Sequence, residues 1–136
     1  MLLVDTGPLV AYINRKDPDH EACAALFTSR TDNLLITPYV LTEACYLVGK
    51  YVSADAEINL IEAVAVGDLV QVDVSAADME RIAELARQYR SFPLGIADAS
   101  VIAIAERLDL EEVATLDHRH FRAVRPKHCD ALTVLP

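Results

Sequence analysis

Four acidic residues stand in places where apolar side chains normally predominate. Asp5 and Asp117 each follow a short apolar run, whereas Glu43 and Asp98 interrupt apolar stretches of helical character. Taken singly, each acid has an ordinary explanation, because a carboxylate can cap a turn or lie half exposed. Taken together, the four acids predict a catalytic or metal-binding site, since packing gives no reason for so many carboxylates in such settings.

Carboxylates that converge raise one another's pKa unless a cation compensates their charge. The acids are not accompanied by histidine or cysteine at the spacing of zinc ligands, so oxygen ligands dominate and favour Mg²⁺ or Mn²⁺. Such an ion can bind a phosphodiester, activate water and stabilise the leaving oxygen. The four acids therefore predict metal-dependent hydrolysis of phosphodiesters.

Two threonines accompany the aspartates. Thr6 follows Asp5 directly, and Thr115 precedes Asp117 by two residues. Each hydroxyl could orient the neighbouring carboxylate, a water or a phosphate, and the alternative is that it caps a turn. Both are supporting candidates for the site.

A basic segment without any acid follows Asp117, although the chain carries a formal net charge of -9. That charge argues against passive binding to nucleic acid, which depends on an excess of Lys and Arg. It does not exclude a nuclease, because bound cations make an acidic site attractive to phosphate. Because arginines offer bidentate contacts, the segment could form a phosphate-facing rim, and a merely solvated surface is an equally open alternative. The candidates are Arg119, Arg122, Arg125 and Lys127, with His118, His120 and His128 among them.

The elements that must position these side chains alternate between strands and helices. Short apolar runs predict strands at 2–4, 34–36, 69–72, 113–116 and 132–135. Apolar periodicity predicts helices at about 7–13, 20–28, 38–51, 55–66, 76–89 and 96–105. The alternation predicts the α/β class, as a three-layer α/β/α sandwich around a mostly parallel sheet of four to five strands. Right-handed crossovers then bring Asp5 and Asp117 to one edge of the sheet.

Capping residues mark the starts of several predicted helices. Thr6, Asp19, Thr37 and Ser53 precede helical stretches, and Ser75 begins a capping box with Asp in place of the usual Glu. These signals support the predicted boundaries.

Length and composition limit the remaining possibilities. The 136 residues fit one domain, and a hydrophobic fraction of 53% indicates self-association. No apolar run approaches the ~18 residues of a membrane span. Three widely spaced cysteines, an odd number, favour a reducing cytoplasm over a disulfide framework.

The ordered set of motifs resembles the PIN-domain family, and within it the VapC-type toxins of bacterial toxin–antitoxin pairs. The resemblance covers nearly the whole chain. It depends on Val4-Asp5-Thr6, Thr42-Glu43, Ala97-Asp98-Ala99, and Thr115-Leu116-Asp117 followed by His120-Phe121.

This resemblance implies a single PIN-like nuclease domain over residues 1–136. It implies an Mg²⁺- or Mn²⁺-dependent endoribonuclease that inhibits translation as the toxin of a type II system. The metal ligands would match Asp5, Glu43, Asp98 and Asp117. The resemblance also implies a homodimer and a small VapB-like antitoxin whose basic residues suit the acidic balance of this chain.

Two other functions remain open at this stage. A HAD-like phosphatase also begins with an apolar strand that ends in Asp, but it needs a second Asp where this chain has Gly7. A non-catalytic domain could use the acidic pocket only to hold a basic peptide. Binding of Mg²⁺ or Mn²⁺ would separate that domain from an enzyme.

Overall fold

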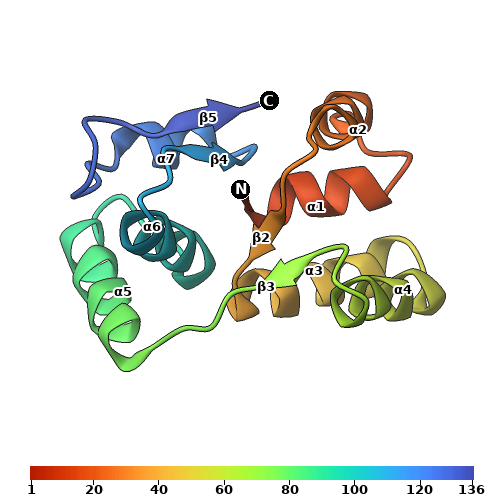
Figure 1. Ribbon diagram of the computed structural model, residues 1–136, viewed down its shortest axis with the longest axis horizontal. Coiled ribbons are helices and arrows are strands. Elements are labelled where there is room, and N and C mark those ends of the chain that lie inside the picture. Colours follow the sequence, from red (N-terminus) through yellow and green to blue (C-terminus); the bar gives the residue numbers. More distant parts are fainter.

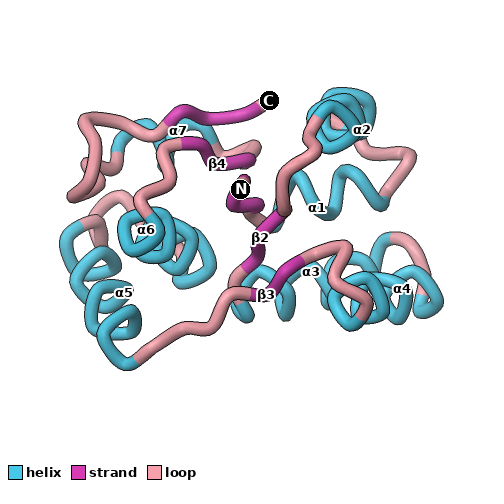
Figure 2. The backbone as a smooth tube through the Cα atoms, viewed as in Figure 1, coloured by secondary structure: helices cyan, strands magenta, loops and turns pink.

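A five-stranded sheet forms the centre of the computed structural model, which describes all 136 residues (Figures 1 and 2). The strands are β1 (Leu2–Val4), β2 (Leu34–Ile36), β3 (Val70–Gln71), β4 (Glu112–Ala114) and β5 (Thr133–Leu135). They pair in the order β3-β2-β1-β4-β5, and every pairing is parallel. The predicted α/β class is confirmed, with a sheet that is parallel throughout.

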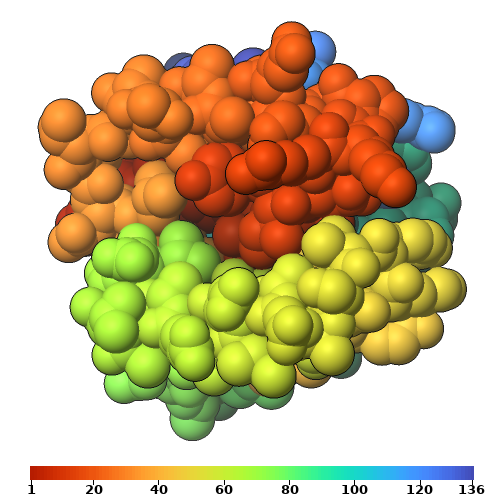
Figure 3. Space-filling model, turned by 90° about the vertical axis from the view of Figure 1, so that its right-hand side faces the viewer, coloured from red at the N-terminus to blue at the C-terminus, as the bar shows by residue number.

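Seven helices cover the sheet. They are α1 (Thr6–Ile13), α2 (His20–Ser29), α3 (Pro38–Tyr51), α4 (Ala54–Ala65), α5 (Ala76–Gln88), α6 (Ile96–Leu108) and α7 (His118–Ala123). In Figure 1, α1, α2 and α4 lie to the right of the strands and α5 and α6 lie to the left. Figure 3 faces the right-hand side, where the first two helices lie above the green and yellow segment that contains α4. The three-layer sandwich is therefore present.

β1 is the central strand and is completely buried. Leu2, Leu3 and Val4 are all 0% exposed, because helices cover both faces of the strand. Leu3 pairs with Leu35 on one side and with Val113 on the other. A strand buried on both faces reads as an unbroken apolar run, which explains why three residues were enough to predict it.

α6 contains the longest continuous buried stretch of any helix. Every residue from Ala99 to Ala105 is buried. Small alanine side chains let this helix pack against neighbours on several sides. Asp98 lies in its first turn, directly before this buried stretch.

The order in which strands are added to the sheet changes direction at β1 and β4. From β1 the chain adds β2 and β3 on one side of the sheet, and it then returns past β1 to add β4 and β5 on the other. Open α/β sheets bind ligands at such switch points, beyond the carboxyl ends of the strands. Here the backbone N–H of Asp5 donates to the carbonyl of Ala114 over 2.9 Å, which fixes the two strand ends side by side.

Three of the predicted caps are confirmed. The side chains of Thr37 and Ser53 accept hydrogen bonds at the starts of α3 and α4. Ser75 and Asp78 form the predicted capping box, in which each side chain accepts a backbone N–H from the other residue, over 3.1 and 2.9 Å.

Two other caps differ from the prediction. Asp5, not Thr6, occupies the N-cap position of α1, and Thr6 is already the first helical residue. Asp19 occupies the N-cap position of α2, but its side chain makes no capping bond. Because the carboxylate of Asp5 does not cap its helix, it is left for another role.

The segment between β4 and β5 contains a helix that the sequence analysis did not predict. α7 follows β4 directly and spans only six residues. Phe121 is its one buried residue, so the segment has none of the apolar periodicity that identifies longer helices. β3 is two residues shorter than predicted, and β4 and β5 are each one residue shorter.

None of the helices is both long enough and apolar enough to cross a membrane.

Candidate active site

A polar pocket of about 490 Å³, which we call the acidic pocket, lies at the switch point between β1 and β4. Its wall comes from the end of β1, the start of α1, helices α3 and α6, and the segment between β4 and α7. The lining residues are Asp5, Thr6, Gly7, Glu43, Asp98, Leu116 and Asp117. The structure thus brings all four predicted acids to one pocket.

Asp5 is the most deeply buried of the four acids. It is only 4% exposed, and its Oδ2 atom accepts a hydrogen bond of 2.8 Å from the hydroxyl of Thr115. Its Oδ1 atom is buried and has no hydrogen-bond partner. A buried carboxylate oxygen without a partner is costly unless something else occupies the site with it.

Thr115 connects the two strand-end aspartates. Besides donating to Asp5, its hydroxyl accepts the backbone N–H of Asp117 over 3.0 Å. Thr115 thus makes the orienting contact suggested by its place in the sequence. The hydroxyl of Thr6 also lines the pocket, but it is buried and makes no hydrogen bond.

Asp117 differs from Asp5 because it does cap a helix. Its Oδ1 atom accepts the backbone N–H of His120 over 3.2 Å, and it lies 2.9 Å from Nδ1 of the same histidine. No hydrogen bond reaches its Oδ2 atom. Each strand-end aspartate therefore has one oxygen held by the protein and one oxygen left free.

Glu43 lies on the exposed face of α3, between Thr42 and Tyr46, which are exposed as well. The inference that an apolar helix encloses its charge is wrong, because the apolar residues around it in the sequence face the other way. Its side chain nevertheless lines the acidic pocket. Glu43 thus contributes from the solvent-facing side of the site.

Asp98 is half-buried in the first turn of α6, whose N-cap is Gly95. Burial, followed by the negative charges of Asp5, Asp117 and Glu43, raises the pKa of Asp98 to about 8. The pKa of Asp5 is also raised, chiefly by burial. In the absence of a cation, the pocket therefore retains protons that isolated aspartates would lose near neutral pH.

The donor set fits a hard divalent cation. As the side chains stand, no three acidic, histidine or cysteine residues form a group that could hold a metal ion. Mg²⁺ rarely needs such a cage, because it keeps several waters and commonly takes only one or two carboxylates. The unpartnered Oδ1 of Asp5 and the raised pKa of Asp98 are the features that a cation in this pocket would relieve.

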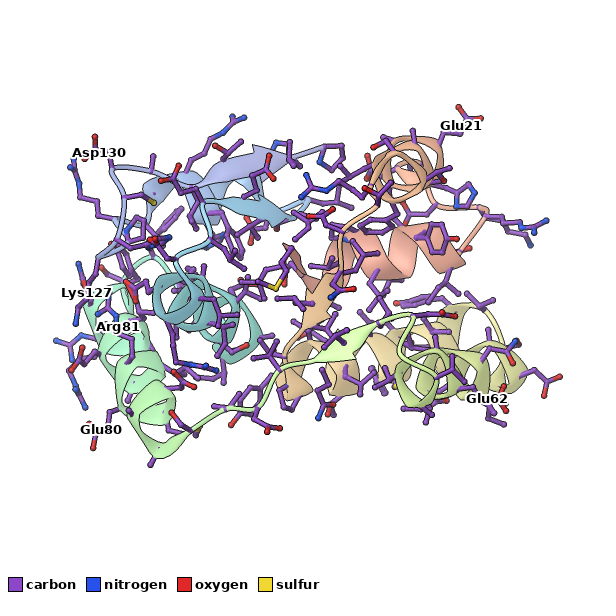
Figure 4. All side chains as sticks on the ribbon, viewed as in Figure 1. Glu21, Glu62, Glu80, Arg81, Lys127 and Asp130 are labelled. Atoms are coloured by element: carbon purple, nitrogen blue, oxygen red, sulfur yellow. The ribbon has the colours of Figure 1, made fainter.

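The predicted basic rim divides into two parts. Arg119 is exposed, and its guanidinium lies 4.7 Å from the ring centroid of Phe92. Arg122 and Arg125 are also exposed, and none of these three arginines forms an ion pair. Lys127 instead lies near α5, where Figure 4 shows it next to Arg81.

The contacts of Lys127 explain its separation from the other basic residues. Its Nζ atom lies 3.7 Å from a carboxylate oxygen of Glu84, and its backbone N–H donates to Glu106 over 2.7 Å. His128 is likewise occupied elsewhere, since its Nε2 atom lies 2.7 Å from the carbonyl oxygen of Leu110. Neither residue lines the acidic pocket.

A second pocket, of about 370 Å³, lies on the face shown in Figure 3. Apolar residues from α1, α2 and α4 form most of its wall, and Asp68 is its one acidic residue. It therefore lacks the groups that hydrolysis would need. The three cysteines are free and contribute to neither pocket.

Sequence reasoning missed Phe92, and it named His120 only as a member of the basic rim and of the motif that follows Asp117. The rings of Phe92 and His120 are stacked, with centroids 4.3 Å apart, and His120 contacts Asp117. The spacing of His120 three residues after Asp117 was a usable signal, because residues three apart on a helix lie on one face. Nothing in the sequence around Phe92 indicates that its loop reaches α7.

Comparison with known proteins agrees with this arrangement. Residues 2–126 match the PIN domain family. Ribonuclease VapC26 of Mycobacterium tuberculosis is 36% identical over 135 residues, which cover 99% of this chain and all of that protein.

Two solved structures share the fold at 18% sequence identity. VapC20 of Mycobacterium tuberculosis, a toxin that cleaves the sarcin–ricin loop, superposes with a TM-score of 0.78 over 83% of this chain and 87% of that chain. VapBC2 from Rickettsia felis, bound to a DNA fragment from its promoter, gives a TM-score of 0.69 over 99% and 98%. The family match over residues 2–126 and the 36% identity to VapC26 show that the chain belongs to the PIN-domain family and, within it, to the VapC group.

Proposed function

We propose that this protein is a metal-dependent endoribonuclease and the toxin of a type II toxin–antitoxin pair. The observation that carries the proposal is the gathering of four carboxylates, from four separate segments, around one pocket at the switch point of the sheet. The full-length similarity to a VapC ribonuclease supports RNA as the substrate class. Hydrolysis of RNA phosphodiesters would inhibit translation.

Asp5, Asp98, Asp117 and Glu43 are the residues that we propose to hold Mg²⁺ or Mn²⁺. When bound, such an ion compensates the carboxylates, polarises the phosphodiester and favours attack by water. Thr115 keeps Asp5 in one orientation by hydrogen bonding to its Oδ2 atom, so that Oδ1 stays available. Thr6 contributes a hydroxyl to the same wall.

The exposed arginines supply the contact with RNA in this proposal. Arg119, Arg122 and Arg125 have no carboxylate partner, so their guanidinium groups are free to contact phosphates. Lys127 is left out, because it is paired near α5. The three arginines compensate locally for the net charge of -9.

A small VapB-like antitoxin is the proposed partner, and a homodimer is the proposed state of the toxin. A VapBC structure that matches 99% of this chain supports the first proposal, and the exposed apolar side chains of α3 and α4 support self-association. We place the protein in the cytoplasm, where its RNA substrate is found and where its three cysteines would stay free.

The direct test is RNA cleavage by the purified protein with Mg²⁺, with Mn²⁺ and with a chelator. Asp98→Asn should abolish cleavage and leave the fold unchanged, because the amide keeps the size of the side chain and removes the negative charge. Glu80→Gln is the matched control, since Glu80 is exposed on α5 and forms no ion pair. Full activity of Asp98→Asn would refute the assignment.

The two alternatives give different results in the same assays. A HAD-like phosphatase would release phosphate from monoesters and would need a second Asp at the position of Gly7. A non-catalytic acidic domain would bind a basic peptide but would take up neither Mg²⁺ nor Mn²⁺. Calorimetric titration with both metals distinguishes the binding domain from the nuclease.

A further inference from the structure

The imidazole of His120 touches the acidic pocket only through Asp117. Its Nδ1 atom lies 2.9 Å from Oδ1 of Asp117. An ionised carboxylate has only acceptors, so Nδ1 must carry the proton and donate it. The side chain of His120 is 23% exposed and that of Asp117 is 37% exposed, so the bond is partly shielded from water.

Phe92, in the loop that precedes α6, contacts the imidazole of His120. The two rings stack with centroids 4.3 Å apart and planes inclined by 27°. The guanidinium of Arg119 lies 4.7 Å from the Phe92 ring centroid. Stacking of this kind limits rotation of the imidazole, since the ring cannot turn without losing the contact.

We propose that His120, stacked on Phe92, is a positioning residue that fixes the Asp117 carboxylate so that Oδ2 faces the reacting groups. The proposal rests on the proposed nuclease function and goes beyond it by assigning a role to two residues outside the pocket wall. Ligands of a metal are commonly oriented by such outer hydrogen bonds, and loss of one typically costs about 10–100-fold in affinity or activity.

Capping of α7 does not by itself account for this arrangement. The capping bond to Oδ1 of Asp117 comes from the backbone N–H of His120, which any residue except proline would supply. The bond from Nδ1 reaches the same oxygen and needs a side-chain donor at this position. Both bonds hold Oδ1, and together they leave Oδ2 as the free atom.

Two substitutions of His120 separate a positioning role from a structural one. His120→Ala removes the donor, and we expect kcat for RNA cleavage to fall about 10–100-fold with little change in KM. His120→Asn restores an N–H close to the position of Nδ1, and we expect it to recover most of the lost kcat. A merely structural role would give equal losses in both variants, in step with their thermal stability.

Mn²⁺ binding without RNA gives a readout that does not depend on activity. We expect His120→Ala to bind Mn²⁺ about 10–100-fold more weakly than wild type by calorimetry, and His120→Asn to lie between them. If the wild type cleaves RNA and His120→Ala equals it in kcat and in Mn²⁺ affinity, the positioning role is wrong.

Failure of the nuclease assignment remains distinguishable. If the wild type does not cleave RNA, the function is wrong, and the Mn²⁺ affinities alone decide the role of His120. If the wild type does not bind Mn²⁺ either, Asp117 is no ligand and the positioning proposal is also wrong.

Phe92→Leu tests the stacking contact with a variant that keeps apolar bulk. We expect a smaller fall in kcat than for His120→Ala, again without a change in KM, because the bond to Asp117 is loosened and not removed. His128→Ala is the matched control, since that imidazole contacts the carbonyl of Leu110 and does not line the acidic pocket. It should leave kcat and Mn²⁺ affinity unchanged.

Discussion

Asp5 and Asp78 are equally buried, at 4% exposed each, but their surroundings differ completely. Asp78 accepts hydrogen bonds from Ser75 and Arg107, and these outweigh the effect of burial, so that its pKa is lowered. Asp5 has no cationic neighbour, and burial raises its pKa. The comparison shows that burial alone does not decide the state of a carboxylate: a partnered one stays ionised, and an unpartnered one is neutralised by a proton or by a bound cation.

The same contrast holds for the two regions around these residues. On the side of α5 and α6, Arg81 bonds to Glu106 at 2.7 Å, and both side chains are largely buried. We call this region the ion cluster; its members are Asp78, Arg81, Glu106, Arg107 and Lys127. Positive and negative charges compensate each other there, whereas every charged side chain that lines the acidic pocket is negative.

Asp5→Asn should have the largest effect on activity. We expect RNA cleavage to fall more than about 100-fold, since loss of an outer hydrogen bond alone typically costs 10–100-fold. The same substitution should raise the melting temperature of the metal-free protein, because it removes an uncompensated buried charge and keeps a group that accepts from Thr115. Thermal melts and cleavage rates of one preparation check both expectations. A lower melting temperature would mean that Asp5 is already compensated.

Divalent cations should stabilise the protein through the acidic pocket. At Mg²⁺ or Mn²⁺ about 100-fold above the dissociation constant, we expect a gain of about 2.7 kcal/mol in the free energy of unfolding. Asp5→Asn should lose most of this gain, and Asp78→Asn should keep it. Denaturant unfolding with and without a chelator measures the difference. Equal stabilisation of both variants would place the ion elsewhere.

The two regions should also respond to pH with opposite signs. The pKa of Asp98 is about 8 in the folded protein against an ordinary value of 3.8, so its contribution to stability is full below about pH 4 and is lost as pH rises toward 8. The pKa of Asp78 is lowered, so its contribution is present above about pH 4 and is lost as the solution becomes more acidic. In metal-free protein, Asp98→Asn should flatten the loss between pH 5 and 8 that thermal melts detect.

Asp78→Asn should destabilise the fold without affecting the chemistry. We expect a loss of about 1–2 kcal/mol in the free energy of unfolding, because the substitution breaks the charged bond to Arg107 and keeps an acceptor for the capping box. The value is modest since the Arg107 side chain is 42% exposed and recovers contact with water. Activity per folded molecule should equal that of wild type, and a loss of kcat would show that the ion cluster also supports the acidic pocket.

The parts of the fold that could be predicted follow from local rules. β1 and the burial of α6 were predictable because strands and helices covered on all sides read as apolar runs. Asp5 and Asp117 could be brought together because parallel strands end at one edge. Thr37 and Ser75 marked helix starts, since side-chain caps act within one turn.

The parts that could not be predicted depend on contacts between distant segments. The exposed position of Glu43 follows from the rotation of α3 against α1 and α6, which neighbouring residues do not determine. Lys127 belongs to the basic segment of the sequence, but the fold places its ammonium group beside Glu84, which lies far away in the chain. The stack of Phe92 on His120 joins a loop to a six-residue helix, and neither element has a periodic pattern.

Arg119→Ala should have the smallest effect. It tests whether RNA contacts only the exposed arginines or also the ion cluster. Arg119 is exposed and free of carboxylates, so its loss should raise KM for RNA about threefold, as expected for one exposed charge. It should also reduce the slope of log KM against log salt by about 0.7, the value for one phosphate contact on a single strand. Lys127→Ala removes the same charge from the ion cluster, and we expect no change in either quantity. If Lys127→Ala behaves like Arg119→Ala, RNA crosses both regions, and the compensated charges near α5 contribute to binding as well as to stability.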